Sequence, residues 1–326
     1  MRRRAFITLL GGAAAAWPLA ARAQQTGKLH RVGFLGSATA AGSANALESL
    51  RAGLREFGYV ESTNIDIEFR WAEGRYDRLP QLVAELIASN VDVLITHGTP
   101  GTRAAKQATA TIPIVMAISG DAIATGLVSS LARPEANLTG STFFLPQLNA
   151  KRLELLNEAC PGISRPAALS NPDNPVSRPI IPAMQAVAAA LSLTVEIVRA
   201  QSPSEFSLAF AAMAKSRADS VVVTEDGEFA ASFRAIATLA LANKLPSIGA
   251  AEYAEAGGLI GYGVDILALY RRAAYFVHRI LKGANSADLP IEQPTKFELI
   301  VNLKAAKTLG LTISETFLVR ADKVIE

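Results

Sequence analysis

Short apolar runs alternate with amphipathic segments along almost the whole chain, and this alternation constrains the fold more than any other feature. The run 92–96 is apolar on both faces. It is followed by a small-residue loop at 97–102 and by a segment of helical spacing that opens at Arg103. Strands that are apolar on both faces and alternate with helices are typical of a parallel sheet covered by helices on both sides. The sequence therefore predicts an α/β protein.

The alternation restarts in the middle of the chain, after Pro161 and Gly162. The second half repeats the plan of the first at a similar length, with polar and glycine-rich loops after its strands. Two successive α/β halves predict two lobes with a ligand cleft between them, because pockets prefer such interfaces. We interpret the Pro-rich stretch 290–294 as a crossing linker. The expected strands are 32–35, 65–69, 92–96, 114–118 and 138–144, then 167–169, 195–197, 221–223, 247–249 and 259–260.

The amino terminus is predicted to be an export signal covering residues 1–23. Three arginines precede an apolar run at 5–19, and Ala21, Arg22 and Ala23 form a small-x-small cleavage site. Arg3 and Arg4 resemble the twin-arginine motif. Sec export stays open as the alternative, because the usual polar residue ahead of the pair is missing. The apolar run is shorter than the roughly 20 residues of a membrane span. We therefore expect a bacterial protein released into the periplasm.

Charge and cysteine content exclude several classes of protein. Residues 1–23 hold four of the 32 basic residues and no acidic one, which leaves 28 basic against 29 acidic residues and a net charge of −1. A chain of this balance shows no basic surface for nucleic acid. Cys160 is the only cysteine, so the chain has no intrachain disulfide, and a lipid anchor on a cysteine after the cleavage site is excluded. The protein must be held together by its core.

The sequence carries no strong catalytic or metal-binding motif. His30, His97 and His278 stand apart from any cysteine or carboxylate at metal-ligand spacing, so we expect no metal site and no cofactor. The phosphate-binding loop ending in Gly-Lys-Ser/Thr and the Gly-x-Ser-x-Gly elbow are both missing. His97 acting as a base beside Thr99 is a weaker alternative to a polar loop residue.

Small polar and acidic residues follow the expected strands and form the predicted ligand site. Gly98 and Thr99 are placed near a helix start, where backbone N–H groups favour a carboxylate. Asp226 is suited to an ammonium group, although an Asp before a helix is equally expected to be a cap. Tyr262 or Phe143 would flank an apolar part of the ligand. The predicted ligand-binding residues are Ser37, Gly98, Thr99, Ser119, Asp121, Asn171, Asp226 and Tyr262.

The sequence resembles the periplasmic substrate-binding proteins of ABC transporters, in the branch that includes tryptophan- and tyrosine-associated receptors. The likeness covers nearly the whole chain after residue 23. It lies in the export signal and in the stretches 98–100, 137–140, 171–175, 252–265, 270–274 and 289–311. One departure stands at Gly120, Asp121 and Ala122, where members of the family usually carry Asp-Pro.

The resemblance implies the type I periplasmic-binding fold, with two Rossmann-like lobes joined by three crossovers. We expect lobe 1 to hold residues 28–145 and about 266–294, and lobe 2 to hold 146–265 and about 295–326. In related receptors, loops like that at Gly98 and Thr99 hold the ligand carboxylate, and an acid placed like Asp226 holds the ammonium.

The expected function is that of a solute receptor rather than an enzyme. It would deliver a small organic solute, an amino acid or an aromatic acid, to an ABC permease, and would be a monomer or a weak dimer. A sensory receptor of the same fold is the alternative, and an α/β hydrolase or transferase is the less favoured one. A receptor binds its solute stoichiometrically and makes no product, which separates it from the enzyme.

Overall fold

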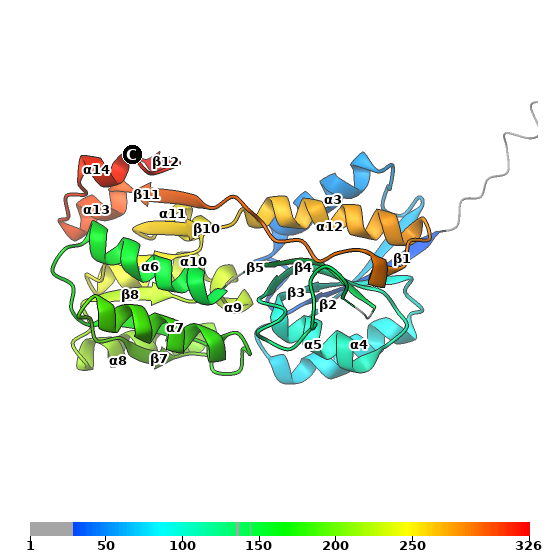
Figure 1. Ribbon diagram of the computed structural model, residues 1–326, viewed down its shortest axis with the longest axis horizontal. Helices are drawn as coiled ribbons and strands as arrows, with labels where there is room; N and C mark the ends of the chain where they lie inside the picture. The colour runs from blue at the N-terminus through cyan, green and yellow to red at the C-terminus, as the bar shows by residue number, and fades with distance from the viewer. Residues whose placement is uncertain (1–28, 135–136, 144) are drawn as a thin grey trace, which may run out of the picture.

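The computed structural model describes residues 29–134, 137–143 and 145–326, and it contains two α/β sheets side by side along its long axis (Figure 1). The predicted export signal lies outside the described residues, as does position 144 of the expected strand 138–144. Among the described residues, no helix is long and apolar enough to cross a membrane.

The first sheet has five parallel strands in the order β2-β1-β3-β4-β5. Helices α3 and α12 cover one face, and α4 and α5 cover the other (Figure 1). Its elements are β1 (His30–Gly36), α3 (Ala44–Glu56), β2 (Ile65–Trp71), η1 (Tyr76–Arg78), α4 (Leu79–Ala88), β3 (Val93–His97), α5 (Gly98–Ala108), β4 (Ile114–Gly120), β5 (Leu138–Phe143), and, from much later in the chain, α12 (Ile266–Leu281) and η2 (Ser286–Asp288). We call this body lobe 1.

The second sheet has seven strands in the order β12-β11-β10-β9-β8-β6-β7. All neighbours pair in parallel except β10 and β11, which are antiparallel. We call this body lobe 2. Its elements are α6 (Leu145–Ala159), β6 (Pro166–Ser170), α7 (Ser177–Ala190), β7 (Glu196–Arg199), α8 (Pro203–Lys215), β8 (Ser220–Val223), α9 (Gly227–Ala231), α10 (Phe233–Ala242), β9 (Ser247–Gly249), α11 (Ala251–Glu255), β10 (Ile260–Gly263), β11 (Glu298–Asn302), α13 (Leu303–Leu309), α14 (Glu315–Leu318) and β12 (Lys323–Ile325).

Alternating side chains of the central strands pack against opposite helix layers. In lobe 2, Val221 and Val223 belong to the apolar cluster with α8 and α10, whereas Val222 belongs to the cluster with α6 and α7. In lobe 1, Ile95 faces α3 and α12, whereas Leu94 faces α4 and α5. Successive side chains on a strand point to opposite faces, so a strand covered on both sides must be apolar throughout. The predicted α/β class is confirmed.

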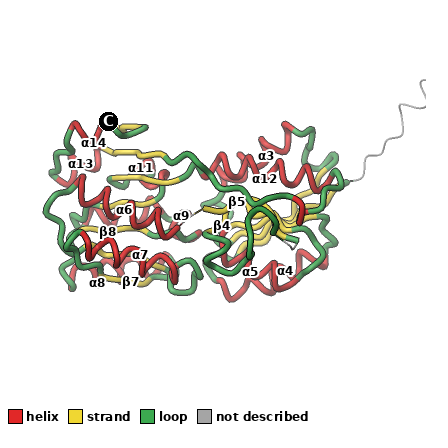
Figure 2. The backbone as a smooth tube through the Cα atoms, in the orientation of Figure 1, coloured by secondary structure: helices red, strands yellow, loops and turns green. Residues whose placement is uncertain are grey.

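The chain passes between the lobes three times: between β5 and α6, between β10 and α12, and in the stretch before β11 (Figure 2). The last of these first runs along lobe 1, where Glu292 N donates to Gly140 O at 2.9 Å and Thr142 N donates to Glu292 O at 2.9 Å. Two lobes joined by three crossings match the type I periplasmic-binding fold that the sequence predicted.

Helix α5 begins earlier than predicted, which is a correction to the sequence analysis. The segment 97–102 was expected to be a loop, but α5 starts at Gly98 and includes Thr99, Pro100, Gly101 and Thr102. Glycine, threonine and proline are poor helix formers in the helix interior. The first turn tolerates them, because its N–H groups have no intrahelical partner and proline lacks an N–H.

Candidate functional site

A cleft of about 580 Å³ lies between the two lobes. It is lined by residues at the carboxyl ends of β3 and β4 in lobe 1 and of β8 in lobe 2, together with the starts of α3 and α12. Ligands of parallel α/β sheets bind at this edge. The cleft is therefore the candidate ligand site.

The start of α5 forms the polar part of the lobe 1 wall. Gly98 has φ of 78°, a left-handed backbone conformation that favours glycine, and it lies directly after the strand. His97, at the N-cap position, makes no side-chain capping bond, and Pro100 has no N–H to cap. The N–H groups of Gly98 and Thr99 thus stand at an uncapped helix start on the cleft wall, where an anion is stabilised.

Thr99 and Ser119 are brought together as the sequence predicted them to be, at the ends of neighbouring strands. Their hydroxyl oxygens lie 3.1 Å apart, and Gly120 N donates to Thr99 Oγ1 at 3.0 Å. Both residues are buried and both line the cleft. This network holds the end of β4 against the start of α5.

His97 is a neutral member of the same wall. Burial lowers the pKa of His97 to about 4, so the imidazole is uncharged at neutral pH. Its Nδ1 is hydrogen-bonded to the hydroxyl of Tyr270 on α12, and burial raises the pKa of that phenol. Because the ring is held by Tyr270, and the Thr99 hydroxyl by Ser119, the hypothetical His97–Thr99 catalytic pair is not assembled in this structure.

Asp226 in lobe 2 is both the cap of α9 and a point of contact with lobe 1. Its Oδ1 accepts from the N–H groups of Glu228 and Phe229 at 2.9 and 3.4 Å, which is the capping arrangement. Its Oδ2 accepts from Tyr76 Oη at 2.6 Å. The side-chain amides of Asn171 and Asn174 donate to the same oxygen, each at 3.0 Å. Asp226 therefore already has five donors.

Burial is the main influence on the pKa of Asp226 and raises it, while the bonds from Tyr76, Asn174 and the α9 backbone lower it. Tyr76 belongs to lobe 1, so its bond to Asp226 joins the two lobes directly. The pKa of the Tyr76 phenol is raised well above its usual range by burial and by the neighbouring carboxylate. The phenol stays protonated and is the donor.

Close backbone approach accompanies this contact. A Cβ atom at Gly227 would lie 2.4 Å from Ser37 Oγ and 3.1 Å from His97 Nε2, both in lobe 1. A side chain at this position would force Ser37 or the backbone of α9 to shift, which glycine avoids. The two lobes are therefore in direct contact at α9.

Arg152, on α6, is the most deeply buried cation of the cleft wall, with 1% of its side chain exposed. Its Nε donates to Tyr262 O at 2.7 Å, and its Nη1 lies 2.5 Å from Glu225 Oε1. Glu225 also accepts from Asn149 Nδ2 at 2.6 Å. This ion pair places one buried positive and one negative charge side by side at the end of β8.

Glu252, on α11, stands near the same pair. Its Oε1 accepts from the N–H of Ile266, the first residue of α12, at 3.2 Å. Burial raises the pKa of Glu252 to about 7, outweighing the opposite effects of its backbone hydrogen bonds and of Arg152. The carboxyl of Glu252 therefore titrates near neutral pH.

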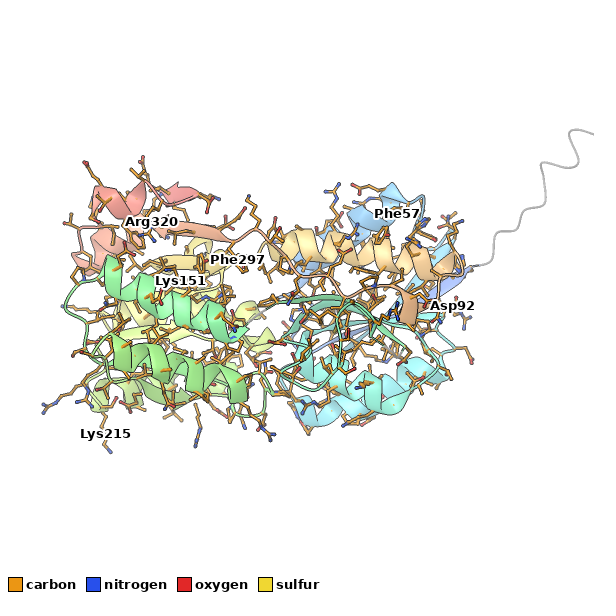
Figure 3. The ribbon with its side chains drawn as sticks, viewed as in Figure 1. Phe57, Asp92, Lys151, Lys215, Phe297 and Arg320 are labelled. Carbon is orange, nitrogen blue, oxygen red and sulfur yellow. The ribbon has the colours of Figure 1, made fainter. Side chains whose placement is uncertain are left out.

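The remaining predicted residues lie around the cleft or away from it. Ser37 is buried at the contact with Gly227, and Asn171 supports Asp226 from behind. Asp121 caps a turn through the N–H groups of Ile123 and Ala124. The ring of Tyr262 stacks on Phe297 at 6.0 Å, on the lobe 2 side of the crossing segment (Figure 3). The cleft lining includes Phe143 but not Ser37, Asp121, Asn171 or Tyr262.

Sequence reasoning missed Tyr76, Arg152, Glu225 and Glu252. Glu225 directly precedes Asp226 at the end of a predicted strand, so its position alone was a sufficient signal. Arg152 lies inside an amphipathic helix and is fully buried. No spacing rule separates it from half-buried basic residues such as Lys151.

Comparison with known proteins identifies the family. Residues 40–325 match the family model described as ABC transporter substrate binding protein. A tyrosine-binding protein of Clostridioides difficile is 26% identical over 259 residues, which is 79% of this chain and 74% of that protein.

Solved structures agree with this assignment. A domain from Streptococcus pneumonia, solved in complex with L-Trp, is 27% identical, with a TM-score of 0.83 over 91% of this chain and 100% of that one. A leucine-binding protein from Thermotoga maritima is 13% identical and shares the fold, with a TM-score of 0.58 over 86% of this chain and 87% of that one. The chain therefore belongs to the substrate-binding proteins of ABC transporters.

Proposed function

We propose that this protein binds an amino acid or an aromatic acid, with an aromatic L-amino acid as the leading ligand, and delivers it to an ABC permease from the periplasm. The observation that carries this proposal is the cleft itself. It sets an uncapped helix start in lobe 1 opposite the carboxylates of Glu225 and Glu252 in lobe 2. A zwitterion needs both.

In the proposed pose, the ligand carboxylate lies at the N–H groups of Gly98 and Thr99, beside the Ser119 hydroxyl. The ammonium lies at the lobe 2 acids. Asp226 supports this wall from behind and does not bind the ligand itself, because its five donors already use both of its oxygens. Apolar side chains border the space between the two ends and suit an aromatic ring: Ile118, Phe143, Val176, Phe233 and Ile266.

The relatives support this ligand class. One relative is named for tyrosine, and another was solved with L-Trp. Their sequences are 26% and 27% identical to this chain. Closure of two lobes on a ligand is a population shift driven by contacts to both of them. Lobe 1 as 28–145 with about 266–294, and lobe 2 as 146–265 with about 295–326, remain our proposal for the two moving bodies.

The function is tested on protein purified from the periplasmic fraction after expression of the whole chain. Mass spectrometry checks cleavage after Ala23. A thermal-shift panel then compares L-tryptophan, L-tyrosine, L-phenylalanine, L-leucine, 4-hydroxybenzoate and ribose. A ligand at about 100 times its Kd stabilises the folded state by about 2.7 kcal/mol, which shifts Tm by several degrees.

We expect at least one aromatic amino acid or aromatic acid to raise Tm, with one site per chain by calorimetry and no product by mass spectrometry. A shift with ribose alone would contradict the proposed ligand class. Turnover of a bound solute would contradict the receptor.

A further inference from the structure

Glu252, like Asp226, is a carboxylate of the cleft that contacts both lobes. It lies on α11 in lobe 2, and its Oε1 accepts from the first N–H of α12, a helix that packs on lobe 1. Its Oε2 is buried and has no hydrogen-bond partner in the part of the chain that the structure describes. One oxygen is therefore fixed and the other is unused.

The guanidinium of Arg152 lies at the same wall, but its N–H groups are donors and call for an acceptor. Arg152 is almost completely buried, it lines the cleft, and its Nη1 and Nη2 have no hydrogen-bond partner of good geometry among the described residues. Glu225 Oε1, 2.5 Å from Nη1, is likewise without such a bond. The 2.5 Å contact already joins these two charges, which leaves Glu252 Oε2 as the cleft carboxylate oxygen without a partner among the described residues.

The charged groups around Glu252 do not balance its negative charge. Arg152 lowers its pKa and Asp265, just before α12, raises it. Arg152 is already neutralised by Glu225, and Glu255 on the same helix is exposed and paired with Lys323. Arg234 also borders the cleft from α10, and His97 across it is uncharged. An ionised Glu252 therefore lacks a dedicated cation.

We propose that Glu252 selects amine-bearing solutes, binding the ligand ammonium through Oε2, so that aromatic acids without the amine are rejected. This inference rests on the proposed function and decides between its two ligand classes. An ammonium supplies the missing positive charge, whereas a carboxylic acid without an amine leaves the wall unchanged. A site built for a polar group discriminates strongly against an analogue that lacks it.

The proposal has a proton linkage whose sign is determined by the pKa of Glu252. In the free protein that pKa is about 7, and a bound ammonium lowers it. Binding near neutral pH therefore releases protons, and affinity rises with pH. The ionised fraction of Glu252 increases about tenfold from pH 6 to pH 8, so affinity for the amine should rise by about tenfold over that interval and level off above it.

The test uses two pairs of ligands that differ only in the amine. Calorimetry compares L-tryptophan with 3-indolepropionate and L-tyrosine with 3-(4-hydroxyphenyl)propionate, on the wild type and on Glu252→Gln. Glutamine keeps an oxygen for the Ile266 N–H and removes the charge. We expect the wild type to favour the amino acid by about 100-fold or more at pH 8, and the variant to favour it by less than tenfold.

Buffers of different ionisation enthalpy give an independent readout on the wild type. About half a proton should be released per amino acid bound at pH 7, and none in Glu252→Gln. Glu154→Gln, a half-buried carboxylate on α6 paired with Lys151, is the matched control and should leave both quantities unchanged. The melting temperature of each variant checks that it is folded.

The outcomes separate this inference from the proposed function. If both ligand classes bind the wild type equally, or if Glu252→Gln keeps the full preference and the proton release, the selection by Glu252 is wrong and the receptor stands. If neither class binds, the proposed ligand class itself fails, and the role of Glu252 fails with it.

Discussion

The two walls of the cleft differ in how they present charge. Every ionised side chain of the lining belongs to lobe 2: Arg152, Glu225, Asp226, Arg234, Glu252 and Glu255. The described lining residues of lobe 1 and of α12 are all neutral at pH 7, including His97 with its pKa near 4. Lobe 1 instead offers backbone N–H groups at the start of α5 and hydroxyls at the end of β4.

This difference divides the work of recognition. Helix dipoles and hydroxyls do not titrate in the physiological range, so the lobe 1 wall should hold its ligand group equally well at all moderate pH values. Charges on lobe 2 are partly buried, where they interact more strongly and where protonation matters. We expect substitutions in the two walls to differ in both size and pH dependence.

The largest effect should follow removal of the buried cation of lobe 2. Arg152→Met leaves Glu225 partly buried without its ion-pair partner, and breaking such a pair costs about 3 to 5 kcal/mol of unfolding free energy. Urea unfolding measures it. Arg320→Met, which breaks an exposed pair with Glu158, is the control and should cost less than about 1 kcal/mol.

The double variant Arg152→Met with Glu225→Gln sharpens this comparison. It removes both charges, so most of the loss should be recovered. A double variant no more stable than Arg152→Met alone would show that packing, and not charge, dominates at this position.

A side chain at Gly227 should weaken binding by keeping the lobes apart. The added methyl of Gly227→Ala meets Ser37 and His97. Overpacking of this kind costs about 1 to 3 kcal/mol, which here reduces the free energy gained when the lobes close. Affinity should fall by about 10- to 100-fold, with a larger radius of gyration in small-angle scattering. Adding Ser37→Gly removes the nearer obstacle, and failure of that second change to restore any affinity would argue against the contact.

Thr99→Ala tests the neutral wall. It removes the hydroxyl that bonds Ser119 and Gly120 N, so affinity should drop by about 1 to 2 kcal/mol. Calorimetry at pH 6 and pH 8 should give the same loss, because His97 stays neutral over that range. Thr99→Ser keeps the hydroxyl and should bind nearly as the wild type does. A loss that changes with pH would contradict the division between the walls.

The smallest effect is expected for Tyr76→Phe, which removes the hydrogen bond between the lobes. Asp226 keeps four other donors, so no carboxylate is left bare, and closure should weaken by about 0.5 to 1.5 kcal/mol. Ligand affinity falls accordingly, and urea stability of the free protein changes less than affinity does. Equal losses of affinity and stability would mean that the bond also forms when the lobes are apart.

Much of the fold followed from the sequence because apolar runs and helical spacing are local signals. The predicted strand at 92–96 is β3, Val93–His97, and the apolar face at 266–281 is α12. The single helix expected before Ala242 is instead α9 and α10, which are broken at Ser232. The five-residue α11 was not predicted, since one turn and a half has no periodicity to detect.

The site was predictable in part, for the same reason. Gly98, Thr99, Ser119 and Asp226 come together because strand ends meet at one edge of a sheet. Glu252 escaped because it lies on the unpredicted α11. The sequence alone could not show that both oxygens of Asp226 already accept hydrogen bonds. Two of the donors lie more than 50 residues away in the chain, and Tyr76 comes from the other lobe.

Helix α12 also determines when lobe 1 can complete its folding during synthesis. The helix buries Tyr270, Ala273 and Phe276 against elements made more than 120 residues earlier, such as β4 and α3. Until the ribosome has passed residue 281, one face of the five-stranded sheet is covered by α3 alone, although strands β6 to β10 of the other lobe already exist. Domains generally form as units in order of synthesis. Here the lobe that starts first must finish late, and the apolar surface that α12 will cover is the surface on which a chaperone would act.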